Sequence, residues 1–296
     1  MVKGRDGEAV MNNSIPQQKM PVRRRNLTFD MQGIDFSSWH PRGPQLGHLF
    51  SGLSMTFPAG EQFFVDSVRN YMDKLPMENK ELLEQVRGFM GQEAMHSREH
   101  NRWNEAMEEA GYPARKLERI TKAFLGLVYE CTHPFQLGVT IAAEHVTAML
   151  AGLALEDKSM LFEGVDKKIA DFWQWHAIEE TEHKAVAFDV YQLCVTEELG
   201  ATKAYLMRVF TMLLLTLGII VAGLAFQITL SVSDKTIGNR RGWWRFAGAL
   251  FVRPGLVRKL LIPYLTWYLP GFHPWRHDNA HLVQLWKAEY EQTAVM

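Results

Sequence analysis

The chain has 296 residues, and its 32 Lys and Arg residues against 33 Asp and Glu residues leave a net charge of -1. This balance argues against a nucleic-acid binder, and a hydrophobic fraction of 47% excludes a disordered or collagen-like chain. Two cysteines, Cys131 and Cys194, cannot build a disulfide framework. The polar N-terminal stretch lacks the apolar core of a secretory signal, so we expect a cytoplasmic protein.

The first segment, residues 1–57, carries several prolines and little periodicity. We expect an extended arm that wraps the body of the protein or stays partly disordered.

Residues 58–200 show apolar positions at helical spacing and no convincing strand alternation. Pro58 suits a first helical turn, and prolines and glycines divide the rest of the segment. The expected helices cover about 58–75, 78–110, 115–130, 134–155 and 164–198. The pattern predicts an all-α fold, with a helical bundle as its central part.

Residues 201–296 form the third expected region, a helical C-terminal extension with apolar and amphipathic parts. Residues 209–233 contain no charged side chain, and this uncharged stretch is long enough to span a bilayer. Residues 240–272 mix aromatic side chains with arginines, as protein segments that lie at a membrane surface do. The pattern of residues 277–292 predicts an amphipathic helix.

The basic residues around the uncharged stretch argue against a true span. More of them follow it than precede it, so a span would leave the bundle outside the cytoplasm. We expect the stretch to pack against the bundle or to dip into the cytoplasmic face of the membrane, where its Gly and Thr residues would permit a close helix contact across a dimer. An ordinary buried core helix is an equal alternative.

Two Glu-x-x-His motifs, Glu93-Ala-Met-His96 and Glu180-Thr-Glu-His183, lie in long predicted helices. The spacing i, i+3 places both side chains of a motif on one helix face. Between the motifs, Glu144 interrupts an otherwise apolar helix. Taken singly, each glutamate also fits a salt-bridged helix residue.

Glu61 precedes these motifs on the apolar face of the first expected helix, where a first turn alone could favour a carboxylate. With it, the order is Glu, Glu-x-x-His, Glu, Glu-x-x-His, which is the ligand set of ferritin-like di-metal carboxylate bundles. Four carboxylates and two imidazoles suit two divalent ions. We expect iron first and manganese second.

Three further histidines lie beside the motifs. His176 shares a helix face with Glu180 and His183 and is a candidate ligand, although a core role is nearly as well supported. His100 and His145 are candidates for hydrogen bonds to the ligands or for structural roles.

Several segments that carry these candidates resemble one known family. They are residues 57–64 and 67–69, 92–96 with 100–101, 143–145, and 175–176 with 179–189. Over roughly residues 40–290 the chain resembles bacterial proteins catalogued as predicted metal-dependent hydrolases. His176 is also similar to the third imidazole of di-iron arylamine N-oxygenases, which lies one turn ahead of their last motif.

Three functions remain open at this point. The first is a di-iron oxygenase that acts on a hydrophobic, lipid-like small molecule and takes electrons from a donor. The second, which the family label implies, is a two-metal hydrolase. The third is a non-enzymatic iron-binding or membrane-associated protein. The sequence does not identify the substrate.

Overall fold

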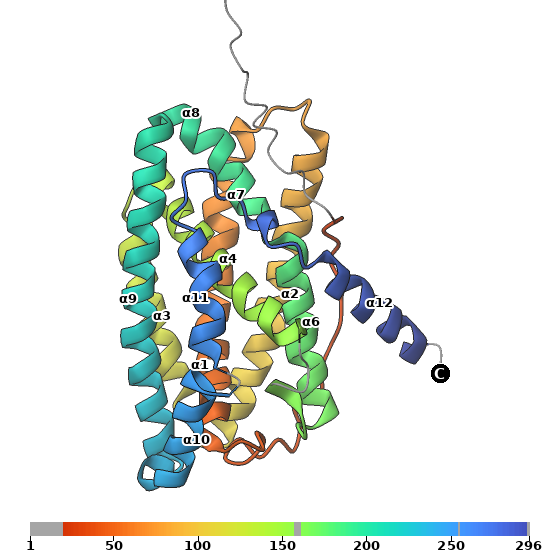
Figure 1. Ribbon diagram of the computed structural model, residues 1–296, viewed down its shortest axis with the longest axis vertical. Helices are drawn as coiled ribbons and strands as arrows, with labels where there is room; N and C mark the ends of the chain where they lie inside the picture. Colours follow the sequence, from red (N-terminus) through yellow and green to blue (C-terminus); the bar gives the residue numbers. More distant parts are fainter. Residues whose placement is uncertain (1–19, 157–160, 254, 295–296) are drawn as a thin grey trace, which may run out of the picture.

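The computed structural model describes residues 20–156, 161–253 and 255–294, and within them every regular element is helical (Figure 1). The predicted all-α bundle is therefore confirmed. The long elements are α1 (Pro44–Arg69), α2 (Lys80–Glu109), α3 (Ala114–Tyr129), α4 (His133–Glu156), α6 (Lys167–His183), α9 (Ala201–Ser233), α10 (Arg240–Phe251), α11 (Leu256–Thr266) and α12 (Ala280–Ala294). Shorter helical turns are η1 (Met72–Lys74), α7 (Val186–Val190), η2 (Tyr191–Val195), α8 (Thr196–Leu199), η3 (Thr236–Gly238) and η4 (Pro274–Arg276).

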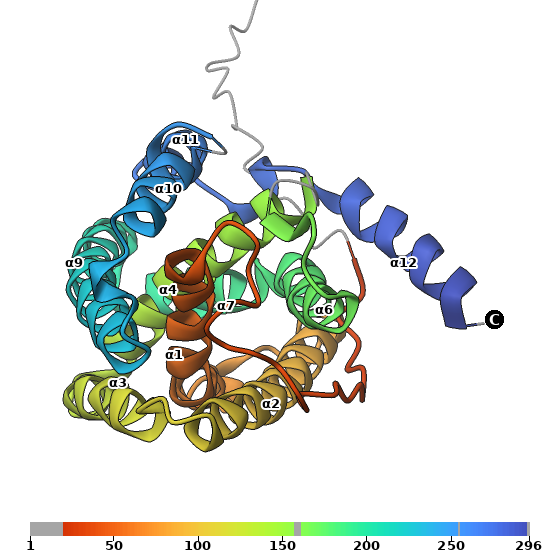
Figure 2. The same ribbon diagram turned by 90° about the horizontal axis from the view of Figure 1, so that it is seen from below.

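Four helices, α1, α2, α4 and α6, form the centre of the molecule (Figure 2). Helix α1 packs chiefly on α2, and α4 packs chiefly on α6. The helix α3 lies outside this group and connects α2 to α4 (Figure 1).

The central helices contribute to two separate apolar clusters. One cluster is built around Trp103 and Trp175, and the other around Phe89 and Trp267. Helices α1, α2 and α4 each pass from one cluster to the other along their length. This is shown by the pairs Met55 and Phe63 on α1, Phe89 and Trp103 on α2, and Ala142 and Ala151 on α4. Helix α6 contributes Ile178 to the first cluster, and α7, which follows it, contributes Val186 to the second. The order of the clusters shows that α1 and α6 run in one direction and α2 and α4 in the other.

Helix α1 begins at Pro44, so the expectation of a helix start at Pro58 and of an extended arm up to residue 57 is wrong. Pro58 lies inside the helix, where it cannot donate a hydrogen bond to the carbonyl oxygen of Ser54. Asn104 Nδ2 from α2 donates to that oxygen at 3.0 Å instead. Glu61 therefore lies in the middle of a 26-residue helix and not in a first turn.

The single helix expected over 164–198 is also corrected, because it is broken directly after the second Glu-x-x-His motif. Helix α6 ends at His183, and α7, a π-helical turn (η2) and α8 follow. At the break, Lys184 Nζ donates to His277 O and to Asn279 Oδ1, both at 2.6 Å. A contact with the C-terminal segment thus holds the chain where the helix ends.

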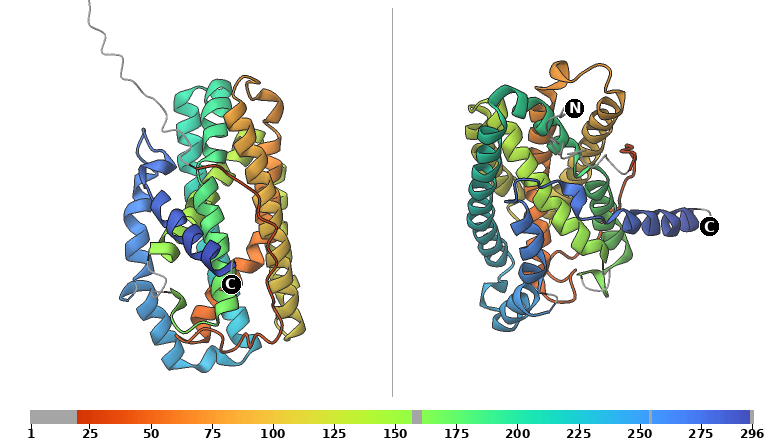
Figure 3. Two further views of the ribbon diagram at one scale, coloured as in Figure 1. Left: turned by 90° about the vertical axis from the view of Figure 1, so that its right-hand side faces the viewer. Right: turned by 45° about the horizontal axis from the view of Figure 1, so that its top comes forward.

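Residues 20–43 form the arm, which runs along α2 and α6 (Figure 3, left). The arm comes so close to α2 that a Cβ on Gly88 would lie 2.2 Å from Val22 O. A side chain at position 88 is therefore incompatible with this path of the arm.

The C-terminal helices α9, α10 and α11 lie along one side of the bundle, while α12 projects away from it (Figures 1 and 2). Trp267 and Phe272, which follow α11, belong to the same apolar cluster as Phe89 of the bundle. Among the described residues, two helices, α4 and α9, are long and apolar enough to cross a membrane by length and composition alone.

Candidate metal centre

The candidate ligands come from all four central helices and lie close together. Glu61 comes from α1, Glu93 and His96 from α2, Glu144 from α4, and His176, Glu180 and His183 from α6. All seven are buried.

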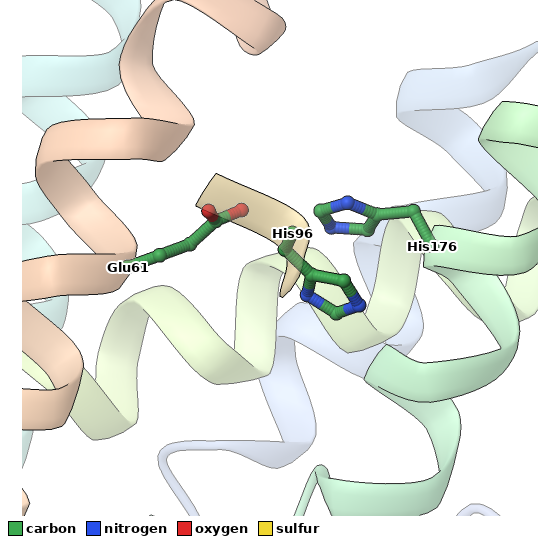
Figure 4. Close-up of side chains that lie close together, drawn as sticks. All are labelled: Glu61, His96 and His176. Atoms are coloured by element: carbon green, nitrogen blue, oxygen red, sulfur yellow. The ribbon is translucent and has the colours of Figure 1, made fainter. Parts of the chain in front are cut away.

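These side chains form two groups of potential metal donors. In the first group, one atom each of Glu61, His96 and His176 lie within 4.8 Å of one another. Figure 4 shows these three side chains, which come from α1, α2 and α6 and point toward a common centre. The second group consists of Glu93, Glu180 and His183, under the same distance limit.

Two carboxylates reach both groups. Glu180 Oε1 lies 3.1 Å from His176 Nε2, while its Oε2 lies 3.6 Å from His183 Nε2. Glu93 Oε1 lies 3.0 Å from His183 Nε2, while its Oε2 lies 3.8 Å from His96 Nδ1. Each carboxylate therefore offers one oxygen to either group, as a carboxylate that bridges two metal ions does.

Glu144 extends the second group. Its Oε2 lies 3.5 Å from His183 Nε2, so the lone acidic residue of the apolar helix α4 meets the motif on α6. The structure thus brings all seven candidate ligands together.

The donor atoms fit a pair of metal ions because their own polar partners are incomplete. Each of the seven side chains has at least one buried oxygen or nitrogen without a hydrogen-bond partner. Such atoms cost stability in a closed protein interior unless something binds them. Oxygen and imidazole nitrogen together suit divalent iron, manganese and zinc, and no thiolate contributes to the set.

The protonation of the centre follows from its burial. Burial raises the pKa of Glu61 and of Glu144 well above the ordinary value. Burial opposes ionisation of Glu180 too, but His183 and His176 hold its pKa well below the ordinary value. In return, nearby carboxylates overcome burial and raise the pKa of His183 well above its ordinary range. Protons shared in this way occupy the positions that metal ions would take.

A hydrogen bond orients His183. Its Nδ1 lies 3.0 Å from Gln92 Oε1, and Gln92 Nε2 donates to Glu182 Oε2 at 2.8 Å. The amide orientation of Gln92 thus makes its Oε1 the acceptor, so Nδ1 of His183 carries the proton. Nε2, the nitrogen on which a metal ion would replace a proton, then faces Glu93 and Glu144.

His96 is oriented by a residue that the sequence interpretation missed. Its Nε2 lies 3.1 Å from Glu179 Oε2, which leaves Nδ1 toward Glu93 and Glu180. Arg25 of the arm binds Glu179 Oε1 at 2.9 Å. Arg25 also donates to both carboxylate oxygens of Glu182 at 2.7 Å, so it binds two glutamates of α6.

A relay of hydrogen bonds fixes His176. Asn104 Nδ2 donates to Ser54 O, so Asn104 Oδ1 accepts the hydroxyl proton of Ser54 at 2.9 Å. Ser54 Oγ must then accept from His100 Nδ1, also at 2.9 Å. His100 Nε2 accepts from His176 Nδ1 at 2.8 Å. This leaves Nε2 of His176 unprotonated and directed at the centre.

The remaining histidine candidate, His145, contacts the C-terminal segment. Its Nε2 lies 3.3 Å from Pro263 O, and its ring stacks on Trp267 with centroids 4.9 Å apart. Burial lowers the pKa of His145 to about 3. These contacts give it a structural role at the junction between α4 and α11.

A pocket of about 460 Å³ lies between α1, α2 and α3, next to the centre. It is lined by Pro58, Ala59, Gln62, Ser97, Asn101, Glu118, Lys122, Leu125 and Tyr129. Ser97 is the link to the donors, because its hydroxyl donates to Glu61 Oε2 at 2.9 Å. The pocket and the donor cluster are therefore separated by a single layer of side chains.

The comparisons with known proteins identify a family. The family model described as "Predicted metal-dependent hydrolase" matches residues 23–278, which include the arm, the bundle and most of the C-terminal helices. No curated protein and no solved structure matches the chain.

Proposed function

The chain belongs to the predicted metal-dependent hydrolase family, and we propose that its bundle holds two divalent metal ions that serve a hydrolytic reaction. The observation that carries the proposal is the position of Glu93 and Glu180, each with one oxygen toward either donor group. Two ions held there would lower the pKa of a bound water and would act as a Lewis acid on the substrate group that the water attacks.

The residues divide into three sets in this proposal. Glu61, His96 and His176 would hold the first ion, Glu144 and His183 would hold the second, and Glu93 and Glu180 would contribute to both sites. Four carboxylates carry a charge that two divalent ions balance, which removes the cost of burying these carboxylates. We propose iron as the first choice and manganese as the second, because both accept mixed oxygen and nitrogen ligands.

The substrate enters through the pocket beside Ser97. Leu125, Pro58 and the ring of Tyr129 give it apolar walls, while Gln62 and Asn101 add hydrogen-bonding groups. We therefore propose a small hydrophobic molecule with one polar, reactive end. The chain's own contribution is to orient this end toward Glu61, whose carboxylate Ser97 holds by its hydroxyl.

A second candidate function rests on the arrangement of the ligands. A glutamate from each of α1 and α4 and a Glu-x-x-His motif from each of α2 and α6 match the pattern of di-iron and di-manganese carboxylate proteins. An O₂-dependent oxidoreductase with this centre would need an external electron donor, whereas a hydrolase would not.

The two functions differ in their need for O₂. The experiment uses the full chain loaded with iron or manganese and follows cleavage of chromogenic esters and phosphoesters in sealed, O₂-free cuvettes. The hydrolase proposal predicts metal-dependent cleavage that O₂ does not change. Turnover that requires O₂ and a reductant would instead establish the second candidate.

The variant Glu93→Gln provides the matched test of the centre. It removes a bridging charge and should abolish cleavage and lower the metal content. Glu99→Gln is the control, because Glu99 is also fully buried on α2 but binds Arg98, Arg102 and the backbone N–H of Phe29. It should keep its metal. Equal activity in Glu93→Gln and wild type would refute the proposed centre.

A further inference from the structure

Helix α9 is far more exposed than its composition requires. Its residues 209–233 carry no charge, and only 17% of its most apolar stretch is buried in the structure. Helix α4 has 24 residues against 33 in α9, and its most apolar stretch is 72% buried, as expected for a core helix. Such a large exposed apolar surface indicates that another molecule covers α9.

The exposed surface extends onto the neighbouring helices. Helices α3, α9, α10 and α11 lie along one side of the bundle when it is viewed from its end (Figure 2). Large apolar side chains are exposed on all four helices, and we call this surface the apolar face. Its members include Leu127 on α3, Leu217 and Leu224 on α9, Trp244 and Phe251 on α10, and Ile262 on α11.

Positive charge is concentrated beside the apolar face. Between Leu199 and His277 the chain has ten Lys and Arg residues and a single acidic residue, Asp234, although the whole chain has a net charge of -1. Asp234 is bound by His48 at 2.8 Å and by the Tyr112 hydroxyl at 3.2 Å. Seven of the basic residues lie in the short region 235–259, at the end of α9 and on α10 and α11, and all seven are exposed. The sequence of residues 235–259 itself contains no Asp or Glu.

We propose that the apolar face rests on a bilayer that contains anionic phospholipids, such as the cytoplasmic leaflet of a membrane. Anionic headgroups complement the excess of positive charge in residues 235–259, and the acyl region covers the apolar side chains. A second copy of this chain would bring the same excess of basic residues. Trp243 and Trp244 lie within the basic region, where aromatic rings mark a lipid–water boundary.

Helix α9 lies in the plane of the membrane and does not cross it. Its buried residues extend from Ala204 near its start to Ser231 near its end, and they pack on α1 and α4. The bundle therefore flanks α9 along its whole length, as Figure 1 shows. An upright α9 would carry the charged outer residues of the bundle into the hydrocarbon, at a cost of several kcal/mol for each charge.

The test is flotation of the purified full chain, diluted from detergent, with vesicles of phosphatidylcholine alone or mixed with phosphatidylglycerol. The proposal predicts that the wild type floats with the mixed vesicles and binds neutral vesicles at least about tenfold more weakly. Added salt should weaken the binding, because it screens exposed charges. A wild type that stays unbound with mixed vesicles would overturn the proposal.

Two double variants separate the apolar and the charged contributions. Leu217→Asp with Leu224→Asp should abolish binding, and Arg241→Glu with Arg245→Glu should remove the preference for anionic vesicles. The matched controls are Met77→Asp, an exposed apolar position before α2, and Lys80→Glu with Arg87→Glu on α2. Thermal melting and metal content verify that each variant is folded. Equal loss of binding in the controls would contradict the assigned surface.

Two further outcomes would refute the proposal in defined ways. If the wild type sediments as a stable dimer, binds no vesicle and becomes monomeric in the Leu217 and Leu224 variant, the apolar face is covered by a second copy. If the protein resists alkaline carbonate extraction and is cleaved by protease from both sides of a vesicle, α9 crosses the membrane. Release by carbonate supports the in-plane arrangement.

Discussion

His183 Nδ1 lies 3.0 Å from Gln92 Oε1, and this contact turns the other ring nitrogen toward the carboxylates of Glu93, Glu144 and Glu180. Gln92 itself is held by Glu182 and by the carbonyl oxygen of Arg23 in the arm. A neutral amide next to the centre thus connects the arm to the ligand geometry.

Replacing Gln92 by leucine should weaken metal binding by roughly tenfold to a hundredfold, because His183 loses the acceptor that fixes its tautomer. Competition with a chelator of known affinity measures the change. Gln85→Leu is the control, since Gln85 is also buried on α2 but binds Glu81 on its own helix. Similar metal affinities for both variants would argue against an orienting role of Gln92.

Arg25→Ala should lower the free energy of unfolding by about 3 kcal/mol, because it leaves buried carboxylates of α6 without their main cation. It should also weaken metal binding through Glu179, which faces His96. Arg25→Lys restores the charge but not the bidentate contact, so it should recover only part of the loss. Urea unfolding measures the stability, and the exposed neighbour Arg23→Ala should match wild type. An unchanged Arg25→Ala variant would show that the arm does not support the centre.

Ala59→Trp should fill the pocket between α1, α2 and α3 and lower the rate of substrate cleavage by tenfold or more, about 1.4 kcal/mol in transition-state free energy. The metal content should stay at the wild-type value, since Ala59 has no ligand atom. Lys116→Trp, at an exposed position on α3, is the control for the added ring. Undiminished cleavage by Ala59→Trp would place the substrate entrance elsewhere.

His40 should make the protein less stable in mild acid. Its Nε2 lies 2.9 Å from Leu161 O and its Nδ1 accepts the backbone N–H of Arg42, and burial lowers the pKa of His40 to about 4. Because the folded pKa is below the unfolded value, the stabilisation is complete above about pH 6.5 and is lost as the pH falls toward 4.

The expected loss between pH 7.5 and pH 5 is about 2 kcal/mol for this one group. Urea unfolding of wild type and His40→Gln is measured at both pH values with chelator present. The comparison separates the pH-dependent contribution of His40 from that of the metal ligands. The difference in stability between the two proteins should shrink by that amount in acid. A constant difference would mean that His40 is protonated in the folded protein.

The sequence predicted the centre because the i, i+3 spacing places Glu93 beside His96, and Glu180 beside His183, whatever the rest of the fold does. The position of Glu61 within its helix could not be predicted, since Pro58 resembles a helix start. Pro58 has no N–H to donate to the carbonyl oxygen of Ser54, and the hydrogen bond from Asn104 that replaces this donor spans 50 residues of sequence.

Of the supporting residues, the sequence predicted His100, which binds His176 Nδ1, but not Glu179 or Arg25. Glu179 resembles any charged helix residue, and its partner Arg25 is 154 residues away in an arm without periodicity. Gln92 precedes a motif residue, which was the one available signal. Contacts of this range depend on the packed fold and have no local pattern.

The central claim is that two metal ions lie between Glu93 and Glu180. Anomalous diffraction at the absorption edge of the bound metal, from crystals of the full chain, tests it most directly. The account predicts two peaks in each chain, about 3.5–4 Å apart, with both carboxylates between them. A single peak bound by one donor group only, or a metal at another place in the chain, would contradict it.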